Sequence, residues 1–100
     1  MEVVFDNDEL DQLETDPKFT GGRPPPIVKA YRKRMQIIRA ASDERDFYKL
    51  NSLRFEKLRG KRKHQYSMRL NDQYRLILEL LGENPLQGTF VKIVGIEDYH

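Results

Sequence analysis

The sequence predicts an α+β fold in which an N-terminal strand and two helices pack on one face of a small, mainly antiparallel β-sheet formed by the C-terminal half. A length of 100 residues suffices for one hydrophobic core but not for two, so we expect a single domain over residues 1–100. Apolar residues recur at helical spacing before residue 42 and with a period of about two after residue 51. This order of elements is typical of α+β proteins.

The first predicted elements are a strand over residues 1–5 and a short helix that follows it. The run MEVVF is apolar and β-branched, which favours a strand or the end of one. Asp6 or Asn7 can cap this helix, because both residue types are favoured at that position. Leu10 and Leu13 lie three residues apart and so share one face of the helix. A proline at position 17 fixes the end of this helix.

A second, longer helix is predicted over residues 26–41, after a stiff TGGRPPP loop over residues 20–26. The last proline of that loop suits the first turn of a helix. Apolar residues then follow at spacings of four, four and three, namely Ile27, Tyr31, Met35 and Ile38. The helix is therefore amphipathic and fits packing on a flat surface. Residues 42–50 are compatible with a further helical turn or an irregular connection, and both interpretations stay open.

The C-terminal half is predicted to be sheet, because apolar and polar residues alternate there. The predicted strands cover residues 53–59, 66–70, 74–81 and 89–96. Asn71 and Asp72 form the expected hairpin turn between the second and third strands, and residues 82–88 form the loop before the last. The run YRLILELL is apolar on both faces apart from Arg75 and Glu79, so we place it at the centre of the sheet.

Charge is divided unevenly along the chain, although the net charge is only +2. The first sixteen residues carry acidic side chains and no basic ones. Between residues 54 and 75, eight basic side chains stand against two acidic ones; the basic residues are Arg54, Lys57, Arg59, Lys61, Arg62, Lys63, Arg69 and Arg75. A basic patch beside an acidic one suits a protein that binds a polyanion on one face and another partner elsewhere. The alternative is an ordinary solvated surface.

Composition also disfavours several kinds of site. The chain has no cysteine, which excludes disulfides and thiolate metal sites, and its two histidines, His64 and His100, are too few for a convincing zinc site. We therefore expect neither a metal nor a small-molecule cofactor. No segment approaches the roughly 20 apolar residues that cross a bilayer, so we expect a cytoplasmic protein without membrane association.

Three motifs in the second half carry a resemblance to a known family. They are Leu58-Arg59-Gly60, the run QYSMRLNDQYRL over residues 65–76, and the ending Asp98-Tyr99-His100. Together they resemble the HigB toxins of the RelE superfamily, which show a leucine-x-glycine turn, a serine-centred strand leading to an aromatic–arginine pair, and a terminal Asp-Tyr-His. The resemblance covers residues 53–100, and the acidic N-terminus and the proline-rich loop take no part in it.

The resemblance implies a RelE-like fold and the toxin of a bacterial type II toxin–antitoxin pair. Such a toxin is a ribosome-dependent endoribonuclease, or mRNA interferase, that cuts messenger RNA on the 70S ribosome and so inhibits translation. The implied protein partner is a HigA-type antitoxin with a helix-turn-helix domain. The implied active site contains the terminal Asp-Tyr-His and a strand arginine, which here are Asp98, Tyr99, His100 and Arg75.

The chemistry of such a site can be matched to these residues. A metal-independent ribonuclease makes the RNA 2′-hydroxyl attack the neighbouring phosphorus, which requires proton transfer and cations that stabilise the transition state. His100 suits proton transfer because the unperturbed pKa of histidine is about 6.5. Tyr99 could orient the base, and Asp98 could position His100. Arg75 suits phosphate stabilisation through its planar fork, with Arg69 and Lys57 as weaker candidates.

The remaining basic residues are predicted to bind RNA through its phosphates. They are Lys57, Arg59, Lys61, Arg62, Lys63 and Arg69. Such contacts position the RNA without reading its sequence. His64 is more easily explained as a surface residue, and four aromatic residues as core rather than base-stacking platforms: Tyr31, Phe55, Tyr66 and Phe90.

Other interpretations remain open. The last three residues would also fit a frayed end, and Arg75 could form a surface ion pair with Glu79 or Glu97. The main functional alternative is a non-catalytic RelE-like basic module that binds the ribosome or nucleic acid and does not need His100. A DNA-binding regulator is disfavoured, because no recognition helix with base-reading side chains is evident.

Overall fold

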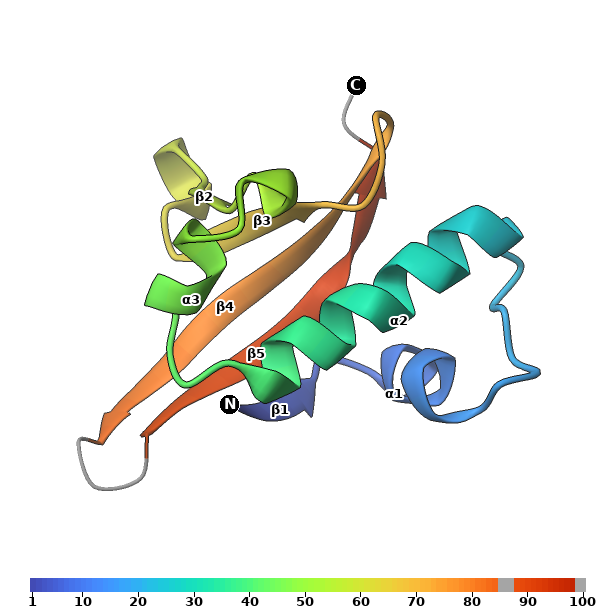
Figure 1. Ribbon diagram of the computed structural model, residues 1–100, viewed down its shortest axis with the longest axis horizontal. Coiled ribbons are helices and arrows are strands. Elements are labelled where there is room, and N and C mark those ends of the chain that lie inside the picture. Colours follow the sequence, from blue (N-terminus) through green and yellow to red (C-terminus); the bar gives the residue numbers. More distant parts are fainter. Residues whose placement is uncertain (85–87, 99–100) are drawn as a thin grey trace.

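The computed structural model describes residues 1–84 and 88–98, and within this range it confirms the predicted α+β class (Figure 1). A five-stranded sheet has the order β1-β5-β4-β3-β2. Its strands are β1 (Glu2–Phe5), β2 (Glu56–Lys57), β3 (Gln65–Arg69), β4 (Tyr74–Asn84) and β5 (Gly88–Asp98). Only β1 runs parallel to its neighbour, β5, and the other pairs are antiparallel. The predicted catalytic residues Tyr99 and His100 lie outside the described range.

The two N-terminal helices form as predicted. Helix α1 covers Asp8–Thr15, and the side chain of Asn7 caps it by accepting a hydrogen bond from the backbone N–H of Leu10 at 3.0 Å. Helix α2 covers Pro25–Ala40 and therefore begins one residue earlier than predicted. The hydroxyl of Tyr31 on α2 donates to the carbonyl of Leu10 at 2.8 Å, which ties the two helices together. Burial raises the pKa of Tyr31 well above its ordinary value.

The segment after α2 is compact but mostly not strand. The undecided stretch contains a single helical turn, α3 (Arg45–Tyr48), and a 3₁₀ turn over Asn51–Leu53 follows it. The predicted strand over residues 53–59 is therefore wrong except for β2, which has two residues. The chain is diverted at Arg54, whose φ of 45° is left-handed and incompatible with a strand. Tertiary burial explains the difference, because Leu53 and Phe55 are both pulled into the core.

The hairpin at the centre of the sheet confirms the prediction from its turn residues. The side chain of Asn71 accepts hydrogen bonds from the backbone N–H groups of Gln73 and Tyr74, at 2.8 and 2.7 Å. Strand β4 lies in the middle of the sheet, as predicted. Residues 82–84, however, belong to β4 and not to the predicted loop, and residues 85–87 lie outside the described range. The strand is irregular between Leu81 and Asn84, where Gly82 adopts a φ of 72°.

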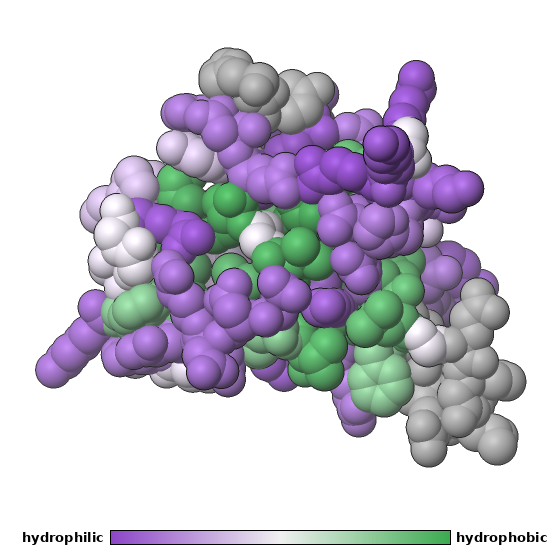
Figure 2. All heavy atoms as spheres, turned by 180° about the vertical axis from the view of Figure 1, so that it is seen from behind, coloured by the Kyte–Doolittle hydropathy of each residue, from purple (hydrophilic) through white to green (hydrophobic). Residues whose placement is uncertain are grey.

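The sheet has one face covered by the helices and one open face. Along β4, Leu76 and Leu78 are completely buried beneath the helices, and together with Met68 and Ile93 they form the centre of the core. Alternate residues point the other way. Figure 2, the view from behind, shows apolar atoms in the middle of this surface and hydrophilic side chains around them. The open face carries the residues of the candidate site.

Candidate functional site

Three arginines from different elements meet on the open face at the β3–β4 hairpin. Arg69 of β3 and Arg75 of β4 are directly opposite each other in the strand register. Together with Arg54, Asn71 and Asp72 they line a cavity of about 210 Å³. Like charges placed opposite each other across two strands repel. A bound anion would relieve this repulsion, and a guanidinium fork is well suited to the oxygens of a phosphate group.

Arg54 was not among the predicted site residues, and its backbone explains how it reaches the cavity. It ends the 3₁₀ turn at a φ of 45°, a conformation uncommon for residues other than glycine. Such strained positions persist only where the surrounding structure holds them, and they are frequent at functional sites. The only sequence signal for Arg54 was its membership of the basic stretch.

Arg75 of β4 has defined partners on β3 and on β2, the next strand beyond β3. Its guanidinium donates to the carboxylate of Glu56 at 2.5 Å and to the hydroxyl of Ser67 at 3.2 Å. Ser67 is completely buried, and Glu56 lies opposite it in the register of β2 and β3. Sequence reasoning missed Glu56, because only the pairing of these two strands reveals it. A carboxylate and a hydroxyl thus fix the direction of a cation that could hold a phosphate.

Two other arginines, Arg62 and Arg69, are also paired with carboxylates. Arg62 contacts both oxygens of Glu97, at 2.9 and 2.6 Å, and this hydrogen bonding raises the pKa of Arg62. Arg69 pairs with Asp72. The predicted basic patch is therefore partly neutralised. The pair of Arg62 with Glu97 was not predicted, because the two residues are 35 positions apart in the sequence.

Only some of the predicted RNA-binding residues join the arginine cluster. Arg59, Lys61 and Lys63 are exposed on the turn between β2 and β3, which contains a 3₁₀ helix at Gly60–Arg62. Lys57 is the cross-strand neighbour of Tyr66, whereas Glu56 is the neighbour of Ser67. Because successive strand residues face opposite ways, Lys57 points away from the open face. The structure does not bring Lys57 to the phosphate site where it was predicted as a weaker candidate.

Asp98 is the one residue of the predicted Asp-Tyr-His ending that the structure describes. It lies opposite Tyr74 in the register of β4 and β5, and Tyr74 is the residue that precedes Arg75 in the chain. One of its carboxylate oxygens accepts a hydrogen bond from the side chain of Gln73 at 3.1 Å. The carboxyl end of β5 is thereby held beside the start of β4.

Metal-binding clusters and membrane-spanning helices are two further features that bear on function. Among residues 1–84 and 88–98, no three histidine, aspartate or glutamate side chains come together in a way that could hold a metal ion. Within the same residues, no helix has the length and apolar character needed to cross a membrane.

Comparisons with known proteins agree with the fold and the motifs. The model of the HigB-like toxin family, RelE-like toxins of the type II toxin–antitoxin system HigB, matches residues 3–93. A YoeB/ParE toxin from Agrobacterium tumefaciens has a similar structure, with a TM-score of 0.61, 13% identity and 100% coverage of both chains. The YoeB–YefM complex from Staphylococcus aureus is also similar, with a TM-score of 0.61, 19% identity and coverage of 100% of this chain and 97% of that chain.

At these identities the two structures establish the fold alone. A comparison with curated proteins gave no significant match. The family match extends over most of the sequence and includes the leucine-x-glycine turn and the serine-centred strand, two of the three motifs that first indicated it. The chain therefore belongs to the HigB-like family of RelE-like toxins from type II toxin–antitoxin systems.

Proposed function

We propose that this toxin is a ribosome-dependent mRNA endoribonuclease that inhibits translation in the bacterial cytoplasm. The observation that carries the proposal is the cavity in which Arg54, Arg69 and Arg75 converge beside the carboxyl end of β5. Such a cavity fits a phosphodiester, and the residues proposed for proton transfer follow immediately in the chain. Membership of a toxin family supports the same function.

The proposed reaction uses the substrate's own 2′-hydroxyl. A bond forms between the 2′ oxygen and phosphorus while the bond from phosphorus to the 5′ oxygen breaks, which leaves a cyclic phosphate and a 5′-hydroxyl end. Arg75 would bind the non-bridging oxygens, whose negative charge grows in the transition state. His100 would transfer the protons, with Tyr99 and Asp98 orienting it. No metal or small-molecule cofactor takes part in this scheme.

The RNA would reach this site along the exposed basic turn. Arg59, Lys61 and Lys63 can bind phosphates of messenger or ribosomal RNA whatever the sequence. Arg62 and Arg69 could do the same after releasing Glu97 and Asp72. The ribosome would supply the alignment of the messenger, so that a small protein needs few base-specific contacts.

The proposed protein partner is a HigA-type antitoxin with a helix-turn-helix domain. Family membership supports an antitoxin, and the similar YoeB toxin is described in a complex with YefM. The acidic strip over residues 6–16 is a surface that the sequence offers for such a partner, but its carboxylates are less available than the sequence alone indicates. Three of its carboxylates already pair within the chain: Asp6 with Lys92, Glu9 with Arg23, and Glu14 with Arg39.

Mapping of cleavage on programmed ribosomes tests the proposed function. Purified toxin is added to 70S ribosomes carrying a defined messenger, and new 5′ ends are located by primer extension, with naked messenger and the His100→Ala variant alongside. We expect ends that require both the ribosome and His100. If translation stops while the messenger stays intact, the non-catalytic binding module is correct and the proposed roles of Asp98, Tyr99, His100 and Arg75 fall.

Neutralising Glu97 is expected to tighten RNA binding. Glu97→Gln frees the Arg62 guanidinium for a phosphate, so affinity for single-stranded RNA should rise several-fold at low salt, and the salt dependence should steepen by about one unit. Filter binding over a salt series measures both. Glu2→Gln on β1 is the matched control, since it makes the same charge change at an exposed position. Equal affinities of the two variants would contradict a competing role for Glu97.

A further inference from the structure

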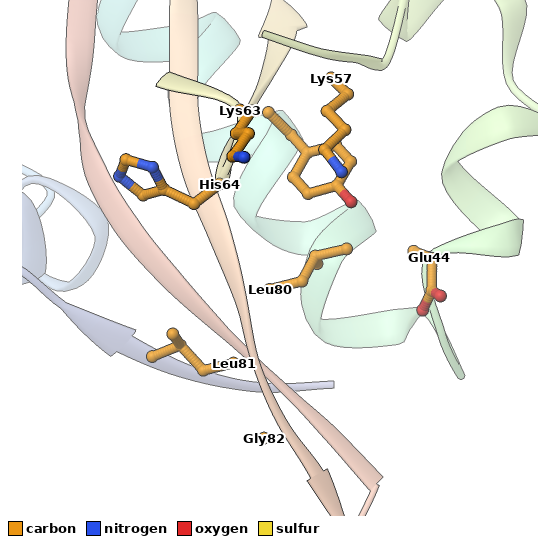
Figure 3. A pocket seen from close by; sticks show the side chains of 8 residues that line it. Glu44, Lys57, Lys63, His64, Leu80, Leu81 and Gly82 are labelled. Atoms are coloured by element: carbon orange, nitrogen blue, oxygen red, sulfur yellow. The ribbon is translucent and has the colours of Figure 1, made fainter. Parts of the chain in front are cut away.

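A second cavity lies at the edge of β4, where β3 stops covering it. The pairing of β3 with β4 ends at Gln65 and Glu79, whereas β4 continues to Asn84. A cavity of about 280 Å³ occupies this place. Figure 3 shows it with Lys57, Leu80 and Glu44 on one side of β4 and with His64 and Leu81 on the other. It is separated from Arg75 by the length of the strand between residues 75 and 81, about 20 Å.

One wall of this cavity is aromatic and held rigidly. Tyr66 lines the cavity and stacks on Phe55, with ring centroids 5.1 Å apart and an interplanar angle of 4°. Phe55 is buried, while Tyr66 is only half-buried. Tyr66 thus packs against the core, as predicted, and also contributes to the lining. Leu80, two residues beyond the partner of Tyr66 on β4, extends the same wall.

The rim of the cavity is mainly cationic. Lys57 and Lys63 line it, and neither forms a side-chain hydrogen bond or ion pair with the rest of the described chain. His64 lies 3.8 Å from Glu79, and Glu44 contributes the one carboxylate of the lining. Figure 3 shows the Lys57 side chain extending toward Leu80. An apolar, aromatic wall with unneutralised lysines beside it matches a ligand that has a flat ring and a negative charge.

We propose that this cavity binds one unpaired nucleotide of RNA, with the base against Tyr66 and Leu80 and a phosphate at Lys57 and Lys63. The choice of RNA rests on the proposed function, because a ribosome-dependent nuclease meets unpaired nucleotides of messenger and ribosomal RNA. Single-stranded RNA is commonly held by stacking on aromatic side chains combined with basic residues that follow its backbone. The cavity would thus anchor RNA several nucleotides away from the bond that is cut.

Titration with mononucleotides tests the base and the phosphate separately. The full-length protein, labelled for NMR, is titrated with adenosine 5′-monophosphate and with ribose 5-phosphate, while the Tyr66 ring and Leu80 methyl signals are followed. We expect saturable shifts at both residues, with the nucleotide binding about tenfold more tightly than the sugar phosphate. Equal affinities, or shifts confined to other residues, would overturn the proposal.

Variants separate this binding from general electrostatics and from loss of folding. Tyr66→Leu should remove the preference for the nucleotide, and Tyr66→Phe should retain it because the ring remains. Lys63→Ala should weaken nucleotide binding several-fold, while Lys49→Ala, an exposed lysine outside the cavity, should not. Thermal unfolding shows whether Tyr66→Leu is folded. If Tyr66→Leu is unfolded, the binding of Lys63→Ala and Tyr66→Phe decides whether the site exists. Equal effects of Lys63→Ala and Lys49→Ala on nucleotide binding would count against the site.

Two further ligands identify the source of the nucleotide. A 2′-O-methylated RNA oligomer, which lacks the nucleophile for cleavage, should displace adenosine 5′-monophosphate from the cavity. Failure to do so would mean a site for free nucleotides. Shifts of Tyr66 and Leu80 with an acidic peptide but not with the nucleotide would mean a protein-docking edge on β4. Either result overturns the proposal. None of these measurements requires cleavage of RNA. A toxin that cleaves messenger RNA normally but does not bind nucleotide in this cavity would therefore refute the proposal for the cavity and leave the proposed nuclease function standing.

Discussion

Arg75→Ala is expected to lower the rate of messenger cleavage on programmed ribosomes about 1,000-fold. An arginine that contacts the transferring phosphoryl group acts mainly in the transition state, because the negative charge on the oxygens grows there. The proposed role suits Arg75, because Glu56 and Ser67 orient its side chain and it shares its cavity with two other arginines. Single-turnover cleavage at saturating toxin measures the effect, and sedimentation with ribosomes should show nearly unchanged binding.

Two variants make the Arg75 experiment specific. Arg75→Lys keeps the charge but loses the two-pronged geometry, so its rate should lie between those of the wild type and the alanine variant. Arg45→Ala removes an exposed arginine of α3 that pairs with Asp43 and does not line the arginine cavity, so cleavage should not change. A folded Arg75→Ala toxin that cleaves at the wild-type rate would remove Arg75 from the reaction.

Phe47→Ala is expected to lower the free energy of unfolding by about 3–5 kcal/mol. The Phe47 ring is completely buried and meets Phe55 edge to face, with centroids 5.1 Å apart. An alanine there would leave a cavity that the rigid neighbours fill only in part. Since domains of this size are stable by about 5–15 kcal/mol, the loss should be obvious in urea unfolding followed by circular dichroism.

The neighbouring residue supplies the control for Phe47. Tyr48 also contacts the Phe55 ring, with ring centroids 4.9 Å apart, but the residue is 55% exposed. Tyr48→Ala should therefore lower the free energy of unfolding much less, and the value for Phe47→Leu should fall between those of the two alanine variants.

Because Phe55 lies between Arg54 and Glu56, the Phe47→Ala variant should also cleave more slowly at urea concentrations below its unfolding midpoint. Equal stabilities of Phe47→Ala and Tyr48→Ala would show that the α3 segment is not part of the cooperative core.

The sequence predicted those elements whose signals are local. Helix α2 follows from the spacing of its apolar residues, and the β3–β4 turn follows from Asn71, whose side chain satisfies two backbone N–H groups next to it. The prediction of a strand over residues 53–59 was wrong, because burial of Leu53 and Phe55 overrides the strand pattern there. Local periodicity contains no information about that competition.

The site was predicted less completely than the fold. Arg69 and Arg75 were recognised, and their shared face follows from the hairpin register. The contacts of Glu56 with Arg75 and of Glu97 with Arg62 were not predicted, because each pair joins segments that are far apart in the sequence. Arg54 escaped notice because its role depends on a left-handed backbone conformation that no neighbouring glycine or proline signals.

The carboxylates paired with the open-face arginines have a consequence for how the toxin moves among the nucleic acids of a cell. An arginine held by Glu97 or Asp72 must lose that partner before it binds a phosphate, and this cost weakens every transient encounter with a nucleic acid. If the toxin acts on messenger RNA as proposed, transfer RNA and free messenger should hold it less tightly than its basic sequence suggests. A correctly shaped target would offer many contacts at once and so offset the cost, and the ion pairs would then shorten the search for that target by limiting unproductive binding.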